Sequence, residues 1–203
     1  MVGLPGPSSR AVSHDGFRML MIVIILLAVL FAAVALYNRL IRARNRVRTA
    51  WSDIDVQLQR RHDLVSRLVS AVDQYAKYER ATLEAVTELR SKAIQTVAVR
   101  ARGKIEEQLG SGVRRIIALA ESYPDLKANE NFLDLQNQLV ETENYLQFAR
   151  RFYNGSVRDY NTMTETVPSN LIASSFRFTP EEFFQKSSDD VANVPLVKIG
   201  TVE

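Results

Sequence analysis

The sequence predicts an all-α protein in which an N-terminal transmembrane helix is followed by an elongated antiparallel, coiled-coil-like bundle of three to four helices. Three observations support this prediction. Residues 19–37 carry no charge, and neither glycine nor proline occurs between Phe17 and Arg102. Two long stretches also repeat apolar residues at alternating spacings of three and four, which is typical of helices that pack along their length.

The uncharged run is long enough for one membrane crossing. Its 19 residues span about 29 Å as a helix, close to the roughly 30 Å hydrocarbon core of a bilayer. Two arginines precede the run, and five follow it: Arg39, Arg42, Arg44, Arg46 and Arg48. Because the more basic side is usually cytoplasmic, we expect the N-terminus outside the cell (inner) membrane and the bulk of the chain in the cytoplasm.

This topology divides the chain into four parts. We expect a flexible tail over residues 1–18, the span over 19–37, a helical cytoplasmic domain over 38–186 and a flexible tail over 187–203. A cleaved signal peptide is the alternative, because Ala33-Val34-Ala35 resembles a processing site. The arginines set the topology and can also attract anionic lipid head groups.

The transmembrane helix is expected to continue into the cytoplasm, since no helix breaker follows it. Eight of the nine positions of its seam are apolar, and Arg61 is the exception. The seam runs Val47, Trp51, Ile54, Leu58, Arg61, Val65, Leu68, Val72 and Tyr75. The repeat loses phase after Tyr75, which predicts a break over residues 76–81.

The next two helices are predicted from their ends. A second helix is expected to stop near Gly103, where Arg100 and Lys104 favour a helix C-terminus. A third, short helix is expected to reach about Ser122, before Tyr123-Pro124 stops it.

The last long helix has the clearest seam, with Asn129 or Asn131 as its N-cap and Pro168 at its end. The seam is Phe132, Leu135, Leu139, Thr142, Leu146, Ala149, Tyr153, Ser156, Tyr160, Met163 and Val167. The segment 179–182 (TPEE) has the capping signals of a further short helix through Phe184. Beyond Lys186 we expect disorder, with a short strand over 194–199 as an option.

Catalytic and metal-binding patterns are not found in the sequence. It contains no cysteine and two histidines, and acidic residues outnumber basic ones after Arg48, which argues against nucleic-acid binding. We interpret His62 and the pairs Asp53/Asp55, Glu106/Glu107 and Glu141/Glu143 as solvated. We interpret Phe148, Phe152, Tyr153 and Tyr160 as core or seam residues. No enzyme activity, metal, cofactor or small-molecule substrate is expected.

Several segments resemble the LemA family, in order and with similar spacing over residues 20–186. They are residues 37–40 (YNRL), 50–58 (AWSDIDVQL), 123–132 (YPDLKANENF), 141–144 (ETEN), 152–154 (FYN), 168–173 (PSNLIA) and 182–184 (EFF). The resemblance implies a bacterial single-pass membrane protein with a helical cytoplasmic domain and no established activity. Occasional gene neighbourhood with membrane metalloproteases implies a link to membrane stress or quality control.

Most positions shared with the family have a structural interpretation, as helix connections, caps and packing residues. They are Trp51, Asp53, Tyr123, Pro124, Asp125, Asn129, Asn131, Phe132, Asn144, Tyr153, Asn154, Pro168 and Asn170. The stretch 96–112 is shorter and richer in Arg and Gly than is usual in the family, and Gly155 falls within the last long helix.

Three functional hypotheses follow. The preferred one is a membrane-anchored interaction or scaffold protein that self-associates or binds other membrane proteins through a surface formed by Leu171, Ile172, Phe176 and Phe178. The second is an enzyme or signal transducer with an unrecognised site, for which Arg61 at a seam position is the lead. The third is a protein that binds or shapes the bilayer.

Overall fold

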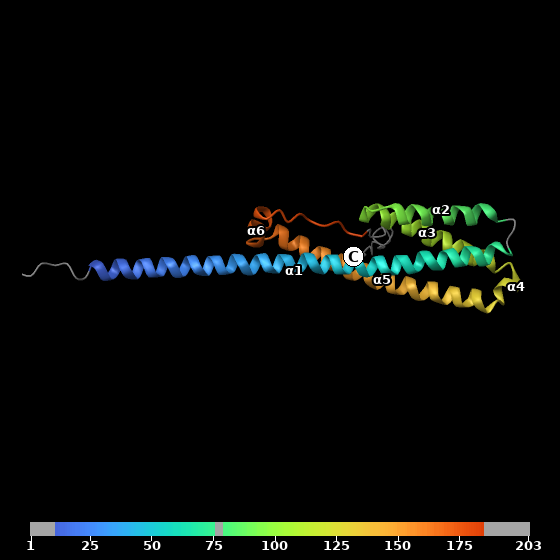
Figure 1. The fold of residues 1–203 in the computed structure, drawn as a ribbon, viewed down its shortest axis with the longest axis horizontal. Helices are drawn as coiled ribbons and strands as arrows, with labels where there is room; N and C mark the ends of the chain where they lie inside the picture. Colours follow the sequence, from blue (N-terminus) through green and yellow to red (C-terminus); the bar gives the residue numbers. More distant parts are fainter. Residues whose placement is uncertain (1–10, 76–78, 185–203) are drawn as a thin grey trace, which may run out of the picture. The chain divides into compact units, whose positions relative to one another are not determined.

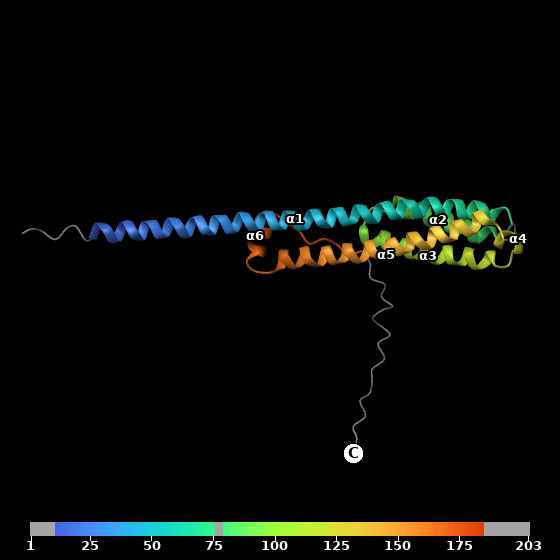
Figure 2. The same cartoon turned by 90° about the horizontal axis from the view of Figure 1, so that it is seen from below.

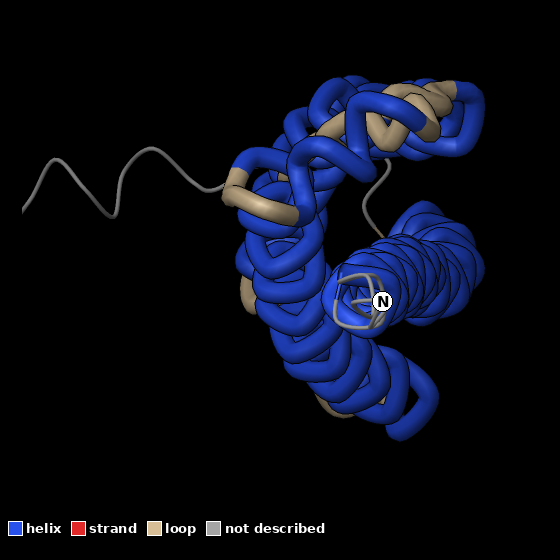
Figure 3. The backbone as a smooth tube through the Cα atoms, turned by 90° about the vertical axis from the view of Figure 1, so that its left-hand side faces the viewer, coloured by secondary structure: helices blue, strands red, loops and turns tan. Residues whose placement is uncertain are grey.

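The structure is a computed structural model, and it describes residues 11–75 and 79–184. These residues form helices and loops with no strand among them, which confirms the all-α prediction (Figure 3). The chain divides into two compact units. The anchor unit takes in the chain up to Arg46 together with Asp159–Pro180, and the bundle unit takes in Val47–Arg158 and the residues after Pro180.

Helix α1, Ala11–Asp73, runs without interruption from the apolar run into the bundle unit (Figure 1). It is the one helix among the described residues that is long and apolar enough to cross a membrane. Side chains 16–32 are exposed, as expected for a surface that faces lipid. The helix already includes residues 11–18, which we had expected in a flexible tail, because nothing in their sequence prevents helix formation there.

The bundle unit is built from the C-terminal half of α1 and three further long helices. These are α2 (Arg80–Gln95), α3 (Val99–Ala120) and α5 (Glu130–Glu165), and a single turn, α4 (Pro124–Lys127), connects the last two. Successive long helices run in opposite directions (Figures 1 and 2). The predicted seams of α1 and α5 supply much of the core, which includes Val65, Leu68, Val72, Leu135 and Leu139.

The break between α2 and α3 lies earlier than predicted. Helix α2 ends at Gln95, and Thr96 has an extended backbone, whereas Gly103 lies buried inside α3. The prediction failed because it treated Gly103 as a helix terminator. A glycine within a helix costs only about 1 kcal/mol, and α3 uses other glycines where neighbouring side chains approach closely.

The connection from α3 to α5 forms as predicted. Helix α3 ends just before Tyr123 and Pro124, and Pro124 then occupies the first turn of α4. The side-chain oxygen of Asn129 accepts hydrogen bonds from the amides of Asn131 and Phe132, at 3.0 and 3.2 Å. Asn129 is therefore the N-cap of α5.

The C-terminal part of the described chain differs from the prediction. A short helix, α6 (Ser169–Ser175), forms over the apolar stretch, and no helix forms over residues 179–184. Side chains of α5 bind the backbone of the latter segment, so its peptide groups have partners without a helix. The disorder expected after Lys186 and the optional strand over 194–199 lie outside the described residues.

Candidate functional site

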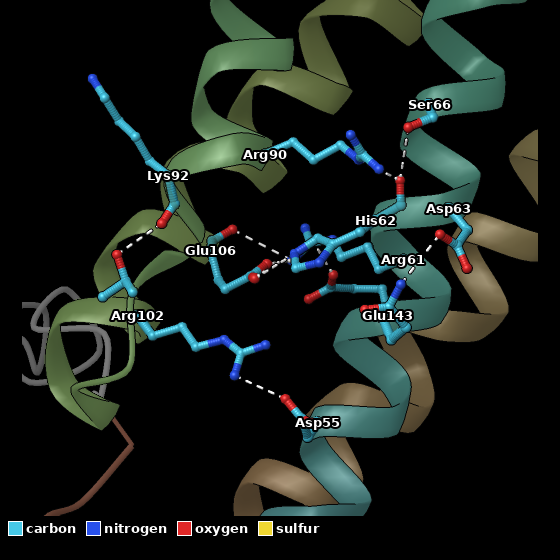
Figure 4. Close-up of polar contacts among 12 residues, drawn as sticks. Asp55, Arg61, His62, Asp63, Ser66, Arg90, Lys92, Arg102, Glu106 and Glu143 are labelled. Atoms are coloured by element: carbon cyan, nitrogen blue, oxygen red, sulfur yellow. Dashed lines mark hydrogen bonds and ion pairs between the residues drawn. The ribbon is translucent and has the colours of Figure 1, made fainter. Parts of the chain in front are cut away.

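A cluster of charged and ionisable side chains lies inside the bundle unit (Figure 4). Arg61 of α1 lies 3.4 Å from a carboxylate oxygen of Glu106 of α3 and 3.2 Å from one of Glu143 of α5. The neighbouring His62 places its Nε2 2.7 Å from the other carboxylate oxygen of Glu106. Three helices are thereby joined through one carboxylate and one guanidinium.

Burial makes these contacts stronger than surface ion pairs. His62 and Glu106 are 0% exposed, and Arg61 is 5% exposed. A second arginine, Arg150, lies 3.7 Å from Glu143 at the edge of the cluster. Burial lowers the pKa of Arg150, while the charge of Glu143 acts in the opposite direction. The two carboxylates and two guanidiniums thus balance each other's charge.

The backbone around His62 is also bonded across helices. Arg90 of α2 donates its Nε–H to the carbonyl oxygen of His62 at 2.9 Å. Gly110 of α3 makes room for the cluster, because a Cβ at that position would lie 2.5 Å from an Nη of Arg61. All four long helices of the bundle unit therefore contribute to the surroundings of residues 61 and 62.

The solvated interpretation of His62 and Glu106 was wrong. Helix α1 contacts α2, α3 and α5, so its buried face is wider than a seam between two helices. This wider face includes His62, which directly follows the seam residue Arg61. Arg61 was identified as an exceptional seam position, and its acidic partners are Glu106 and Glu143. Their identity depends on the register between helices, which the sequence of one helix does not specify.

The cluster has the geometry of an ion-pair network that fixes helix register. Within the described part of the chain, no group of three His, Cys, Asp or Glu side chains is arranged to hold a metal ion. Three surface hollows are lined by side chains of α1, α2 and α3, and Arg61, His62 and Glu106 line none of these three.

A second group of contacts joins α5 to the segment that returns after Pro180. Tyr153 donates its hydroxyl hydrogen to the carbonyl oxygen of Glu182 at 2.8 Å. Asn154 donates to the carbonyl oxygen of Phe184 and accepts from its amide, both at 3.0 Å. Burial, with the nearby charges of Glu181 and Glu182, raises the pKa of Tyr153 to about 12.

The ring of Phe184 completes this group. Its centroid lies 6.0 Å from that of Trp51, which in turn lies 5.5 Å from the ring of Tyr153. The guanidinium of Arg150 lies 5.2 Å above Phe184. The family-like residues Trp51, Tyr153 and Asn154 therefore meet at one place, where they hold the returning segment against α1 and α5.

The other family-like positions are dispersed. Tyr123, Pro124, Asp125, Asn129, Asn131 and Phe132 belong to the connection between α3 and α5, whereas Asp53 and Asn144 are exposed. Pro168 precedes α6 and Asn170 lies within it.

An aromatic stripe covers part of the outward face of α5. It consists of Tyr145, Phe148 and Phe152, at helical spacings of three and four, and the last two are 63% and 54% exposed. The predicted core role is correct for Tyr153 and Tyr160, which are buried, and wrong for Phe148 and Phe152. All four share helical spacing, but Phe148 and Phe152 lie on the side of α5 opposite Leu146 and Tyr153.

In the anchor unit, the predicted interaction surface is divided between packed and exposed side chains. Phe178 is buried beneath Arg44, whose guanidinium lies 4.9 Å from its ring, and Ile172 is half-buried. Leu171 and Phe176 are exposed, although the ring of Phe176 also lies 4.8 Å from that of Tyr37. Of the five arginines, Arg39, Arg42, Arg46 and Arg48 are exposed and Arg44 is half-buried.

Comparison with known proteins agrees with the architecture. The model of the LemA family matches residues 50–199. Protein LemA of Metamycoplasma hominis is 26% identical over 166 residues, which cover 81% of this chain and 75% of the relative. Magnetosome protein MamQ 2 of Paramagnetospirillum magneticum is 24% identical over 205 residues, covering 87% and 75% of the two chains.

A further MamQ protein, from Magnetospirillum gryphiswaldense, is 20% identical and covers 88% of this chain. None of these names denotes an enzyme. The family model covers most of the bundle unit, including the ion-pair cluster and the residues around Trp51 and Tyr153. The chain belongs to the LemA family.

Proposed function

We propose that this protein is a non-enzymatic, membrane-anchored interaction module that associates with a second copy of itself through the aromatic stripe of α5. The single observation that carries the proposal is the exposure of Phe148 and Phe152 beside Tyr145. Exposed aromatic side chains that lie next to one another mark protein interaction surfaces, and aromatic residues dominate the energetics of such surfaces.

Membrane anchoring favours a second copy as the partner. Copies anchored in one bilayer share an orientation, so a two-fold axis normal to the membrane brings the same residues of both copies to the same height. The stripe of one copy would then pack against the identical stripe of the other. Anchoring also raises the effective concentration of each copy near the next, which permits a small interface to be occupied.

Charge around the stripe is compatible with this pairing. Asn144, which is uncharged and exposed, lies one helical turn before Phe148, and Val140 lies one turn further back and is 60% exposed. The guanidinium of Arg151 lies 4.7 Å from the ring of Phe148, so this cation lies over an aromatic face. Glu141, an exposed carboxylate one turn before Tyr145, would approach the same residue of the second copy, and its pairing with Arg60 at 2.9 Å reduces the repulsion between the two.

Cysteine crosslinking in native membranes tests the proposal, because the natural chain contains no cysteine. An Asn144→Cys variant leaves the three aromatic rings in place, and a short bismaleimide is expected to convert it to a covalent dimer. The control is Ser91→Cys, which is exposed on α2. Adding Phe148→Ser and Phe152→Ser to Asn144→Cys should abolish the adduct.

Two results would contradict self-association. If Ser91→Cys crosslinks as well as Asn144→Cys, the adducts arise from random collision in the membrane. If Asn144→Cys yields an adduct of another mass instead of a dimer, the stripe binds a different protein, and the second copy is not the partner.

A further inference from the structure

Helix α6 and the residues on either side of it carry large apolar side chains that are exposed, and they belong to the same unit as the end of the uncharged run of α1. This observation belongs to the anchor unit alone and is independent of the α5 stripe. Along α1, exposure first falls at Ala33, then at Leu36 and Tyr37, and Leu40 is fully buried. Ala33, Leu36 and Tyr37 belong to the uncharged run itself.

Ring contacts show that the residues directly after α6 cover part of this stretch. The ring centroid of Tyr37 lies 4.8 Å from that of Phe176 and 5.8 Å from that of Phe178. Since Tyr37 is the last residue of the uncharged run, an element packed against it lies near the boundary between hydrocarbon and head groups. Tyrosine at this boundary is itself typical of membrane-spanning helices.

The composition of this element suits that boundary. Residues 166–176 carry no charge, although the preceding residue is Glu165 and the following one is Arg177. Within this stretch Val167 is 77%, Leu171 63% and Phe176 59% exposed. Three large apolar side chains exposed within ten residues would be unfavourable in water and favourable in an acyl-chain environment.

The neighbouring charges are complementary to anionic lipid. Arg39 and Arg42 are exposed on α1 directly after Tyr37, and Arg177 is exposed directly after Phe176. Basic side chains beside an apolar surface are the combination that binds bilayers containing anionic lipid. Arg44 is less available, because its guanidinium lies over Phe178.

From the contacts with Tyr37, the exposed side chains and these arginines, we infer that residues 166–177 form a second membrane contact that inserts Val167, Leu171 and Phe176 into the head-group region of the bilayer that α1 crosses. The partner is the lipid surface. The protein is then held at two places, by the span and by this lipid-binding segment.

Depth-dependent quenching in lipid nanodiscs tests the inference with the full-length chain. An environment-sensitive fluorophore is attached to Ser175→Cys, which lies one turn after Leu171 on α6, or to the control Ser91→Cys on α2. In discs containing anionic lipid, nitroxides near the head groups should quench the Ser175 probe several-fold more than the Ser91 probe. Aqueous iodide should show the opposite preference.

The substitutions Val167→Ser and Leu171→Ser, introduced together, should reduce nitroxide quenching at Ser175→Cys to the value at Ser91→Cys. The matched control is Ile94→Ser with Val97→Ser, an exposed apolar pair in the bundle unit, which should leave quenching unchanged. Circular dichroism establishes that helix content is retained in each variant.

Two results would overturn the inference. One is equal access of iodide to the Ser175 and Ser91 probes, which would place α6 in water. The other is a Ser175 probe shielded from both quenchers, which would show that a protein surface covers α6 instead of lipid.

Discussion

Arg61 is the residue on which the buried ion-pair cluster depends, because it contacts carboxylates from two other helices. Its removal would leave Glu106 buried with His62 as the remaining described partner. An uncompensated buried charge is far more costly than a lost surface ion pair. The neighbouring Arg60 provides the comparison, since it pairs with Glu141 at 2.9 Å on the surface.

Arg61→Leu is expected to lower the free energy of unfolding by about 3–5 kcal/mol, whereas Arg60→Leu should cost no more than about 1 kcal/mol. Urea unfolding of the detergent-solubilised protein, followed by the emission of its single tryptophan, Trp51, measures both. Equal effects of the two substitutions would show that burial does not strengthen the Arg61 pairs. Adding Glu106→Gln to Arg61→Leu should restore part of the loss.

Ionisation of Tyr153 makes the free energy of unfolding depend on pH in the alkaline range. Its pKa is raised to about 12 in the folded chain, whereas an unfolded tyrosine ionises near pH 10. Between these values the unfolded state binds fewer protons than the folded state, so stability falls as pH rises, by at most about 1.4 kcal/mol per pH unit. Below pH 10 this contribution is fully present.

Tyr153→Phe should remove this part of the slope. The measurement is urea unfolding at several pH values between 9 and about 12, followed through Trp51, whose ring lies 5.5 Å from that of Tyr153. Lysine residues titrate in both variants and so do not affect the difference. An unchanged slope in Tyr153→Phe would assign the dependence to other groups.

At the scale of the element, α3 approaches its neighbours closely through glycine. A Cβ at Gly112 would lie 2.7 Å from Cγ2 of Val86 on α2, closer than packed atoms approach. Gly155 of α5 differs, since a Cβ there would meet nothing within 4 Å. The same residue type therefore serves packing in one helix and lowers helix propensity in the other.

Gly155→Ala is expected to raise the free energy of unfolding by about 0.5–1 kcal/mol, because alanine favours the helix and meets no obstacle. Gly112→Ala should lower it, because overpacking against Val86 typically costs about 1–3 kcal/mol and outweighs the gain in propensity. Thermal unfolding measured by circular dichroism compares the two variants. Stabilisation by both would mean that α2 and α3 can separate without cost.

The elements show which parts of the fold can be predicted from sequence. Most of the seams of α1 and α5, a break before Arg80 and the Asn129 cap follow from periodicity and local chemistry, and the structure contains them. The last seam positions, Tyr75 and Val167, are exposed, which the periodicity did not predict. The α2–α3 boundary was misplaced because Gly103 was read as a helix terminator, whereas it lies buried inside α3. The capping signals at residues 179–182 were overridden by hydrogen bonds from α5.

The candidate site was less predictable for the same reason. Arg61 could be identified, since a charge interrupts an apolar seam, but His62 and Glu106 resemble surface residues in sequence. Phe148 and Phe152 have the spacing of core residues, and only the position of the neighbouring helices shows that they face outward. The burial of each of these side chains therefore depends on contacts between helices that are far apart in the sequence.

At the scale of the whole molecule, the distribution of charge predicts orientation. The five arginines after the uncharged run outnumber the two before it, which favours retention of the bundle unit in the cytoplasm. Helix α1 contains both the membrane-spanning segment and part of the bundle unit. The side of the membrane on which α1 emerges therefore decides the compartment of the exposed surfaces of the bundle unit.

A membrane-impermeant maleimide applied to intact spheroplasts is expected to label Ser9→Cys and to leave Ser91→Cys unlabelled until the membrane is permeabilised. Labelling of Ser91→Cys in intact spheroplasts would reverse the predicted orientation. Recovery of a chain that lacks the Ser9→Cys label and is shortened at its N-terminus would instead indicate cleavage after Ala35.

The contacts between α5 and the returning segment also affect how the sequence can diverge. Tyr153 and Asn154 bind main-chain atoms of Glu182 and Phe184, and every residue type presents the same carbonyl oxygen. Substitutions at Glu182 therefore preserve the acceptor, whereas substitutions at Tyr153 or Asn154 remove the side-chain donor. The backbone of this segment can therefore keep its position while its side chains change, and the residues that must be retained are those of α5.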